Sequence, residues 1–351
     1  MDNGEWETAA SAGKERWIGT VFALLSTTFY GVSNVVMRYL ADCRVDLDWI
    51  LCYKEIIGLS LLIPWLLFRL FQGRLLYISK RLIVYVIIAS IICELIGSHL
   101  QLLGYAVIGL IIAVPLIQSA TLLGVAILGY TILGDPLSRR RKIAVGILIA
   151  AVTILSVGKA MTGREAEVFV SPPPLVMIAV AAGAFLAGVS FSVYIIILRY
   201  VIRRYWKDEH SPRQSFSLYR WVGYDYAAKS GTRYYSPFPV TLMMAIVFAV
   251  GIVIFSSFLY AKSGPAGFYN VPAAAWYLIL LSGITNAAGF FFQIQGLRMT
   301  TAVQASLVAV CQIVMLSFIG YLFFNEAVNV LVIFGLVLTS YGVIMSAKPE
   351  K

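Results

Sequence analysis

The sequence is poor in charged residues. Only 13% of its 351 residues are charged and 60% are apolar, whereas a soluble protein needs about a quarter of its residues charged. This shortage excludes an ordinary soluble domain. Apolar runs recur along the whole chain, each long enough to cross about 30 Å of hydrocarbon. Because backbone groups in lipid must be satisfied within each segment, the runs predict an all-α integral membrane protein.

Residues that carry catalysis or bind metals are also scarce. The chain has two histidines and four cysteines, and the cysteines show neither zinc spacing nor the density of a disulfide-rich domain. A rhomboid-like protease is excluded, because only His99 lies in a predicted span and Ser282 lacks the glycine of a GxSG element. No GxxxxGK[ST] loop for ATP occurs. We therefore predict no enzyme activity, catalytic residue, metal or cofactor.

The connections between the apolar runs alternate in charge. The predicted spans are roughly 17–40, 49–70, 82–104, 110–133, 143–158, 174–198, 239–260, 274–296, 301–324 and 328–347. Cations concentrate in the N-terminal tail 1–16, in 70–81, in 139–142, in loop 199–238 and in the C-terminal tail. By the positive-inside rule these connections are cytoplasmic. Both termini are then inside, which requires an even number of spans in the cell (inner) membrane, and ten fit.

The net charge of +10 would by itself be compatible with a nucleic-acid partner. Nearly all charges, however, lie in short connections. Loop 199–238 mixes Arg and Lys with Tyr and Trp, as expected for a basic loop against anionic headgroups. We expect the lipid bilayer as partner and no nucleic acid; a regulatory or nucleic-acid-binding role for this loop is the alternative, and a homodimer stays open.

An internal repeat is visible in the sequence, which predicts two five-helix units, 17–160 and 174–348, with loop 199–238 inserted in the second. The clearest match pairs the third span with the eighth at one constant offset: Ser90, Glu94, Gly97, Gln101 and Gly104 correspond to Ser282, Asn286, Gly289, Gln293 and Gly296. An odd number of spans per unit inverts the second unit in the membrane. Inverted repeats are a recurring basis for alternating access in transporters.

The matched residues form a polar stripe on each of the two spans. Their i, i+4, i+7, i+11 spacing places them on one helix face. A stripe of small and hydrogen-bonding residues in an apolar helix should face another helix or a water-filled cavity. Glu94 and Asn286 fall near the middle of their spans, so we expect both to line one central site, with Gln101 and Gln293 on the same faces.

Glu94 is the most informative residue in the sequence. A carboxylate at mid-span costs roughly 2.5–3.5 kcal/mol to insert, and low dielectric favours its protonated form. One hypothesis is that Glu94 pairs with a cationic group of the substrate or carries a coupling proton. The alternative is a neutral acid that bonds to a neighbouring helix.

Other polar residues in the spans are weaker candidates. Asn34, Gln118 and Gln312 are predicted to bind substrate, and each could equally hold helices together. Lys54 and Glu55 are expected to reach the outer interface from the start of the second span. His99 falls off the polar stripe, so packing is expected for it.

The pattern resembles the drug/metabolite transporter superfamily, and within it the EamA family of ten-span proteins. The resemblance covers about 17–347 and includes the link 134–138, Gly-Asp-Pro-Leu-Ser, which is similar to the family's G-E-x-L-S junction. Asn325-Glu326 marks the corresponding place in the second unit. Asp135 departs from the usual Glu, and loop 199–238 is long for the family. The resemblance implies a cavity between the units and transport of small metabolites, amino acids or drugs.

The sequence therefore predicts a secondary transporter, an exporter or exchanger of a small solute, driven by a proton or counter-solute gradient. A nucleotide-sugar or sugar-phosphate exchanger is the first alternative, disfavoured because phosphate binding needs cations and none is expected at mid-membrane. A passive channel or a membrane scaffold is the other alternative.

Overall fold

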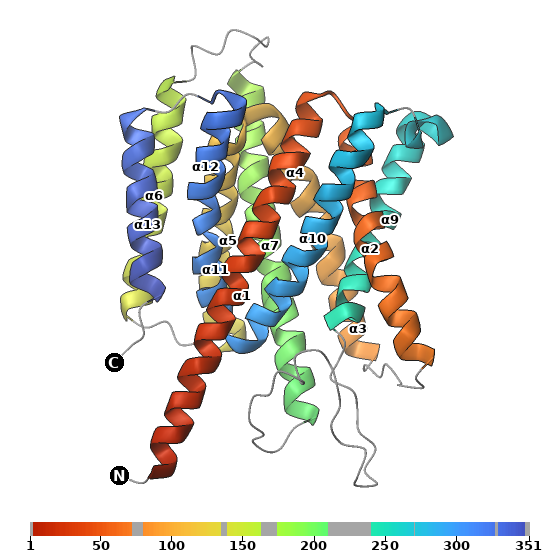
Figure 1. Cartoon of the computed structure of the whole chain (residues 1–351). Coiled ribbons are helices and arrows are strands. Elements are labelled where there is room, and N and C mark those ends of the chain that lie inside the picture. The colour runs from red at the N-terminus through yellow and green to blue at the C-terminus, as the bar shows by residue number, and fades with distance from the viewer. Residues whose placement is uncertain are drawn as a thin grey trace.

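The protein is a bundle of long helices (Figure 1). The computed structural model describes residues 3–71, 80–134, 139–162, 174–209, 240–269, 271–326 and 329–347. The first unit comprises α1 (Asn3–Asp42), α2 (Leu47–Phe71), α3 (Lys80–Ile91), the π-helix η1 (Ile92–Ser98), α4 (His99–Ile108), α5 (Leu110–Leu133) and α6 (Arg139–Thr162). The second comprises α7 (Pro174–Glu209), α9 (Val240–Ser263), the 3₁₀-helix η2 (Gly264–Phe268), α10 (Ala273–Met299), α11 (Ala302–Ala309), α12 (Cys311–Phe324) and α13 (Val330–Ala347).

Eight segments of the described chain are helical, long and apolar enough to cross a membrane. They correspond to the predicted first four spans and to the sixth to ninth. Helices α6 and α13 contain the shorter apolar stretches Lys142–Ala151 and Val330–Thr339. The all-helical membrane fold is therefore confirmed, while the count of ten spans stays a prediction. Helix α1 begins and α13 ends at the same end of the bundle (Figure 1).

Glycines allow the closest helix contacts. Helix α1 packs along α10, and α5 packs along α7. A Cβ on Gly296 would lie 3.2 Å from the backbone oxygen of Gly19, and a Cβ on Gly188 would lie 2.2 Å from the backbone oxygen of Ile117. Lipid tails are as apolar as the side chains, so burying apolar side chains does not drive helix association in a membrane. Small residues promote it instead, because they let the helix backbones approach closely. Two further helix pairs with extensive contact are α2 with α9 and α6 with α13.

Two predicted spans are interrupted. The third span changes from α-helix to the π-helix η1 at Ile92–Ser98, which contains Glu94 and Gly97. The ninth span divides into α11 and α12 at Val310. A π-helix keeps its backbone groups paired through i→i+5 hydrogen bonds, so it can lie within an apolar span. The hydropathy of the sequence therefore does not reveal it. The expectation of two regular helices was wrong at these points.

Several predicted boundaries also differ. Helix α1 already begins at Asn3 and α7 continues to Glu209, so residues 3–16 and 199–209 are helical instead of tail and loop. The Ala, Glu, Lys and Arg in these stretches are strong helix formers. Gly134 has the left-handed φ of 63° expected at a helix end. Asp135 and the rest of the link, and 210–238 of the loop, lie outside the described residues.

Candidate functional site: a central charged cavity

A cavity of about 160 Å³ is lined by helices of both predicted units. It is lined from α1, α2, η1, α4 and α5 of the first unit and from α7, α9, α10, α11 and α12 of the second. All seven predicted site residues line this cavity: Asn34, Glu94, Gln101, Gln118, Asn286, Gln293 and Gln312. The structure thus brings them together, and their role in binding substrate stays a prediction.

The polar stripes divide between the cavity and the helix contacts. Glu94 and Gln101 line the cavity, whereas a Cβ on Gly97 would lie 2.7 Å from the Phe191 ring. In the eighth span Asn286 and Gln293 line the cavity. The small residues of each stripe therefore bring neighbouring helices close, and the long polar ones reach the hollow that these contacts leave.

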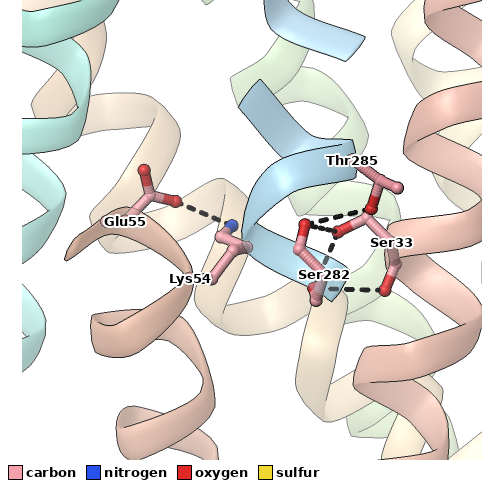
Figure 2. A network of polar contacts seen from close by, with 5 residues as sticks. All are labelled: Ser33, Lys54, Glu55, Ser282 and Thr285. Atoms are coloured by element: carbon pink, nitrogen blue, oxygen red, sulfur yellow. Dashed lines mark hydrogen bonds and ion pairs between the residues drawn. The ribbon is translucent and has the colours of Figure 1, made fainter. Parts of the chain in front are cut away.

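Lys54 and Glu55 form a buried ion pair in the cavity wall. Lys54 Nζ lies 2.8 Å from Glu55 Oε1, with side-chain exposures of 6% and 1%, and Figure 2 shows α10 passing between this pair and Ser33 of α1. The expectation that both side chains reach the outer interface was wrong. Helix α2 packs against α9, and Gly251 of α9 leaves room for the Glu55 stem. The cavity therefore holds a cation that the sequence analysis placed at the surface.

Glu94 lies beside this pair. A Cβ on Gly251 would lie 2.9 Å from Glu55 Cγ and 3.4 Å from Glu94 Cγ, so both carboxylate stems approach one point on α9. Within the part of the chain that the structure describes, Glu55 Oε2 and Glu94 Oε2 are buried without a hydrogen-bond partner. Buried polar atoms are normally bonded. Each acid of the cavity wall thus has one buried oxygen that no described residue satisfies.

Aromatic rings stand next to the carboxylates. Tyr30, Tyr194, Phe248 and Phe290 all line the cavity. The Phe290 ring centre is 6.2 Å from that of Tyr194 and 5.7 Å from that of Phe248. Tyr30 Oη donates to Gln293 Oε1 at 3.1 Å, which directs the glutamine oxygen. Sequence reasoning missed these aromatic residues, because tyrosine and phenylalanine are common in apolar spans.

Side-chain amides form another part of the wall. Gln118 Nε2 donates to Gln312 Oε1 at 2.7 Å, which joins α5 to α12. Among the described residues, Gln312 Nε2 and Ser306 Oγ are buried without a hydrogen-bond partner. Gln101 is bonded to the Tyr105 hydroxyl at 2.5 Å. The cavity wall therefore contains two acid side chains, several side-chain amides and a serine hydroxyl.

Two serines are hydrogen-bonded where α1 packs against α10, a contact called here the α1–α10 seam. Ser33 Oγ lies 2.9 Å from Ser282 Oγ and also donates to the Ser282 backbone oxygen at 3.1 Å. Thr285 Oγ1 donates to the same backbone oxygen at 3.1 Å (Figure 2). The serines at the repeat-related positions, Ser90 of α3 and Ser190 of α7, instead donate to backbone oxygens of their own helices. The α1–α10 seam and the related α3–α7 seam are thus bonded differently.

Two residues of the α2–α9 region lie away from the cavity. His99 Nδ1 lies 3.4 Å from Asp48 Oδ1, and its ring is stacked on Phe255 and meets Phe258 edge-on. Trp49, near the start of α2, is fully buried and its Nε1 donates to the Phe268 backbone oxygen at 3.2 Å. Both are packing residues of the α2–α9 region.

The comparisons with known proteins agree with this architecture. The EamA-like transporter family matches residues 17–157 and 215–347, well over half of the chain. No curated protein matches significantly. One protein with a crystal structure matches 94% of this chain and 96% of its own, with a TM-score of 0.61 and 14% identity, a likeness of fold alone. The resemblance seen in the sequence is confirmed, and the chain belongs to the EamA-like transporter family within the drug/metabolite transporter superfamily.

Proposed function

We propose that the protein is a secondary transporter that carries a small polar or amphipathic solute by alternating access at the central cavity. The observation that carries the proposal is the cavity itself, which has helices of both predicted units and the side chains of Lys54, Glu55 and Glu94 in its wall. Polar groups are retained inside membrane bundles chiefly where they bind or move a solute. The seven predicted residues would contact the solute, and Glu94 would also carry a coupling proton.

The arrangement of ten spans as two inverted units belongs to the same proposal. Helix α2 packs on α9 and α6 packs on α13, which are the self-paired contacts that a pseudo-two-fold axis produces. The hydroxyls of Ser33 and Ser282 are hydrogen-bonded to each other, whereas Ser90 and Ser190 bond within their own helices. This asymmetry supports a second conformation in which the α3–α7 seam is bonded and the α1–α10 seam is not. Both termini would face the cytoplasm of a cell (inner) membrane, and export or exchange is the proposed mode.

A nucleotide-sugar or sugar-phosphate exchanger fits the cavity less well. Lys54 does supply a deep cation, contrary to the sequence analysis, but its ammonium is paired with Glu55 at 2.8 Å. A phosphate would also face the Glu94 carboxylate. A volume of about 160 Å³ lies below the 300–1,000 Å³ of pockets for drug-sized ligands. A small solute without phosphate is therefore favoured.

The test is counterflow in proteoliposomes that contain the purified full-length protein. Vesicles loaded with one unlabelled solute from a panel of amines, amino acids, nucleosides and sugars should accumulate the same labelled solute, with saturation and with acceleration by solute on the opposite side. The Glu94→Gln variant should lose this exchange, and Asp46→Asn, an acid outside the cavity, should keep it. Linear, non-saturating flux would instead indicate a channel, and flux absent for every solute would contradict transport.

A further inference from the structure

The third and eighth predicted spans are related by the internal repeat, but their backbones differ where they line the cavity. Residues 92–98 form the π-helix η1, whereas the repeat-related residues 284–290 belong to the α-helix α10. We infer that the π-helix is a moving part: it lies in the first unit in this conformation and passes to residues 284–290 when the cavity opens to the other side of the membrane. The inference deepens the proposed function and rests on alternating access between the two units.

The number of residues in the two segments does not cause the difference. Ser90 precedes η1 and Gln101 follows it, and their counterparts Ser282 and Gln293 lie at one constant offset. The i→i+5 pairing of a π-helix takes more residues per turn than an α-helix does. Equal lengths of chain are thus a π-helix in one unit and an α-helix in the other, so the surroundings of each segment select its form.

The π-helix brings an additional side chain to the cavity. In the first unit Cys93 and Glu94 both line the cavity. In the second unit Asn286, the counterpart of Glu94, lines it, while Thr285, the counterpart of Cys93, does not. The wider turn of a π-helix accounts for this difference. Exchange of the two helix types should therefore withdraw Cys93 from the cavity and bring Thr285 into it.

The α1–α10 seam stabilises the α-helical form of residues 284–290. Thr285 Oγ1 donates to the backbone oxygens of Leu281 and Ser282 at 2.8 and 3.1 Å, which are bonds within an α-helical turn. Ser33 Oγ donates to the same Ser282 oxygen at 3.1 Å, so one acceptor joins the seam to the Thr285 side chain (Figure 2). Separation of α1 from α10 would remove the Ser33 bond from this acceptor and leave Thr285 free to turn toward the cavity.

The α3–α7 seam has no such link beside η1. Ser90 Oγ donates to the Val86 oxygen at 2.7 Å and Ser190 Oγ to the Leu186 oxygen at 3.0 Å, so neither of these bonds crosses the seam. The seam with a serine contact thus lies beside an α-helix, and the seam without one lies beside the π-helix. In the second conformation the bonded seam would be α3–α7, and the helix types should be exchanged with it.

The alternative is a π-helix fixed by residues that differ between the units. Ile91 precedes η1 and is 41% exposed. A Cβ on its counterpart Gly283 would lie 2.6 Å from Ile57 of α2, and close packing at this glycine would hold α10 in one form throughout the cycle. The two alternatives differ in one observable, which is whether the exposure of positions 93 and 285 changes when a seam opens.

The experiment measures thiol reactivity at positions 93 and 285 in a locked protein. One full-length variant keeps Cys93 and has the other native cysteines replaced, and a second carries Cys93→Ser and Thr285→Cys. In both, Ser33→Cys/Ser282→Cys, at positions whose hydroxyls are 2.9 Å apart, is oxidised to a disulfide that holds the α1–α10 seam. Intact mass follows the reaction with methyl methanethiosulfonate, a small uncharged reagent for accessible thiols, in detergent micelles. In this locked form Cys93 should react at least about tenfold faster than Thr285→Cys.

The unlocked protein and the opposite lock complete the test. Without a disulfide the protein visits both conformations, so Thr285→Cys should react faster than in the locked form and Cys93 more slowly. A disulfide in Ser90→Cys/Ser190→Cys should reverse the order of the two positions. Gln101→Cys and Gln293→Cys are the matched controls, because both positions line the cavity and, as counterparts, should line it in either conformation. Rates are expressed relative to these controls, and the comparison of the first lock with the unlocked protein decides alone if the second disulfide does not form.

Two results would overturn the inference: relative rates at positions 93 and 285 that are the same in the locked and the unlocked protein, or a faster reaction of Thr285→Cys in the first lock. Failure of the transport proposal is separate. A protein whose relative rates change with the lock but that shows no counterflow of any solute would retain the moving π-helix and lose the transport function, whereas counterflow with unchanged rates would do the reverse.

Discussion

The Glu326 carboxylate caps the first turn of α5: its Oε1 lies 2.9 Å from the backbone nitrogen of Leu110. Its Oε2 accepts from the backbone nitrogen of Ile111 at 2.9 Å. A residue between α12 and α13 thus satisfies backbone donors of the first unit, at a helix end where negative charge is favoured. The Asn-Glu pair noticed in the sequence therefore joins the second unit to the first.

We predict that Glu326→Ala lowers the free energy of unfolding by about 1–2 kcal/mol, because two helix-terminal donors lose their acceptor. The matched control is Asp46→Asn, since Asp46 Oδ1 caps α2 at the Asp48 nitrogen and asparagine caps equally well. Its ion pair with Lys262 is exposed, so the loss of that pair should change stability little. Unfolding titrations with denaturing detergent in mixed micelles measure both. Equal stability of the two variants would contradict the cap.

The Lys54–Glu55 pair predicts a non-additive pair of variants. Lys54→Met alone leaves two buried carboxylates uncompensated and should cost about 3–5 kcal/mol, whereas the double variant Lys54→Met/Glu55→Gln removes both charges and should recover most of that loss. Melting temperatures in detergent measure the effect. We expect both the wild type and the double variant to melt at higher temperature than Lys54→Met. A double variant less stable than Lys54→Met would contradict the buried pair.

The seam between α1 and α10 predicts a measurable coupling. A double-mutant cycle of Ser33→Ala and Ser282→Ala should give an interaction energy of about 0.6 kcal/mol, the average for hydrogen bonds between membrane helices. The matched cycle of Ser90→Ala and Ser190→Ala should give a value near zero, because these hydroxyls bond to Val86 and Leu186 of their own helices. Equal coupling in both cycles would mean that the seams do not differ.

Helix packing predicts opposite effects for two glycines. Gly188→Ala places a Cβ 2.2 Å from the Ile117 backbone oxygen, so α7 must move from α5 and the protein should be destabilised by more than about 1 kcal/mol. A Cβ on Gly146 of α6 meets no atom within 4 Å, so Gly146→Ala should be neutral or stabilising by up to about 1 kcal/mol. Thermal melting of the two variants in the same detergent compares them directly.

The membrane fold and much of the cavity lining could be predicted from the sequence, because both follow from regular physical patterns. Backbone groups in lipid must form helices, and a repeat of polar residues at helical spacing cannot face lipid. Glu94, Gln101, Asn286 and Gln293 were placed on common faces in this way. The structure brings all four to one cavity.

The remaining features depend on neighbours that the local sequence does not specify. Lys54 and Glu55 lie close to the start of α2, and their burial follows from the approach of α9 at Gly251. The π-helix Ile92–Ser98 contains Gly97 but no proline, and the break at Val310 has neither glycine nor proline beside it. Hydropathy and spacing carry no signal for either, so tertiary packing determines them.

The central claim is that one cavity opens to each side of the membrane in turn, and side-specific labelling at Asn286 tests it most directly. Asn286→Cys, in a protein whose four native cysteines are replaced, would be reconstituted and treated with a membrane-impermeant maleimide inside or outside the vesicles. The account predicts labelling from both sides. Labelling from one side only, or from neither, in every condition would contradict it.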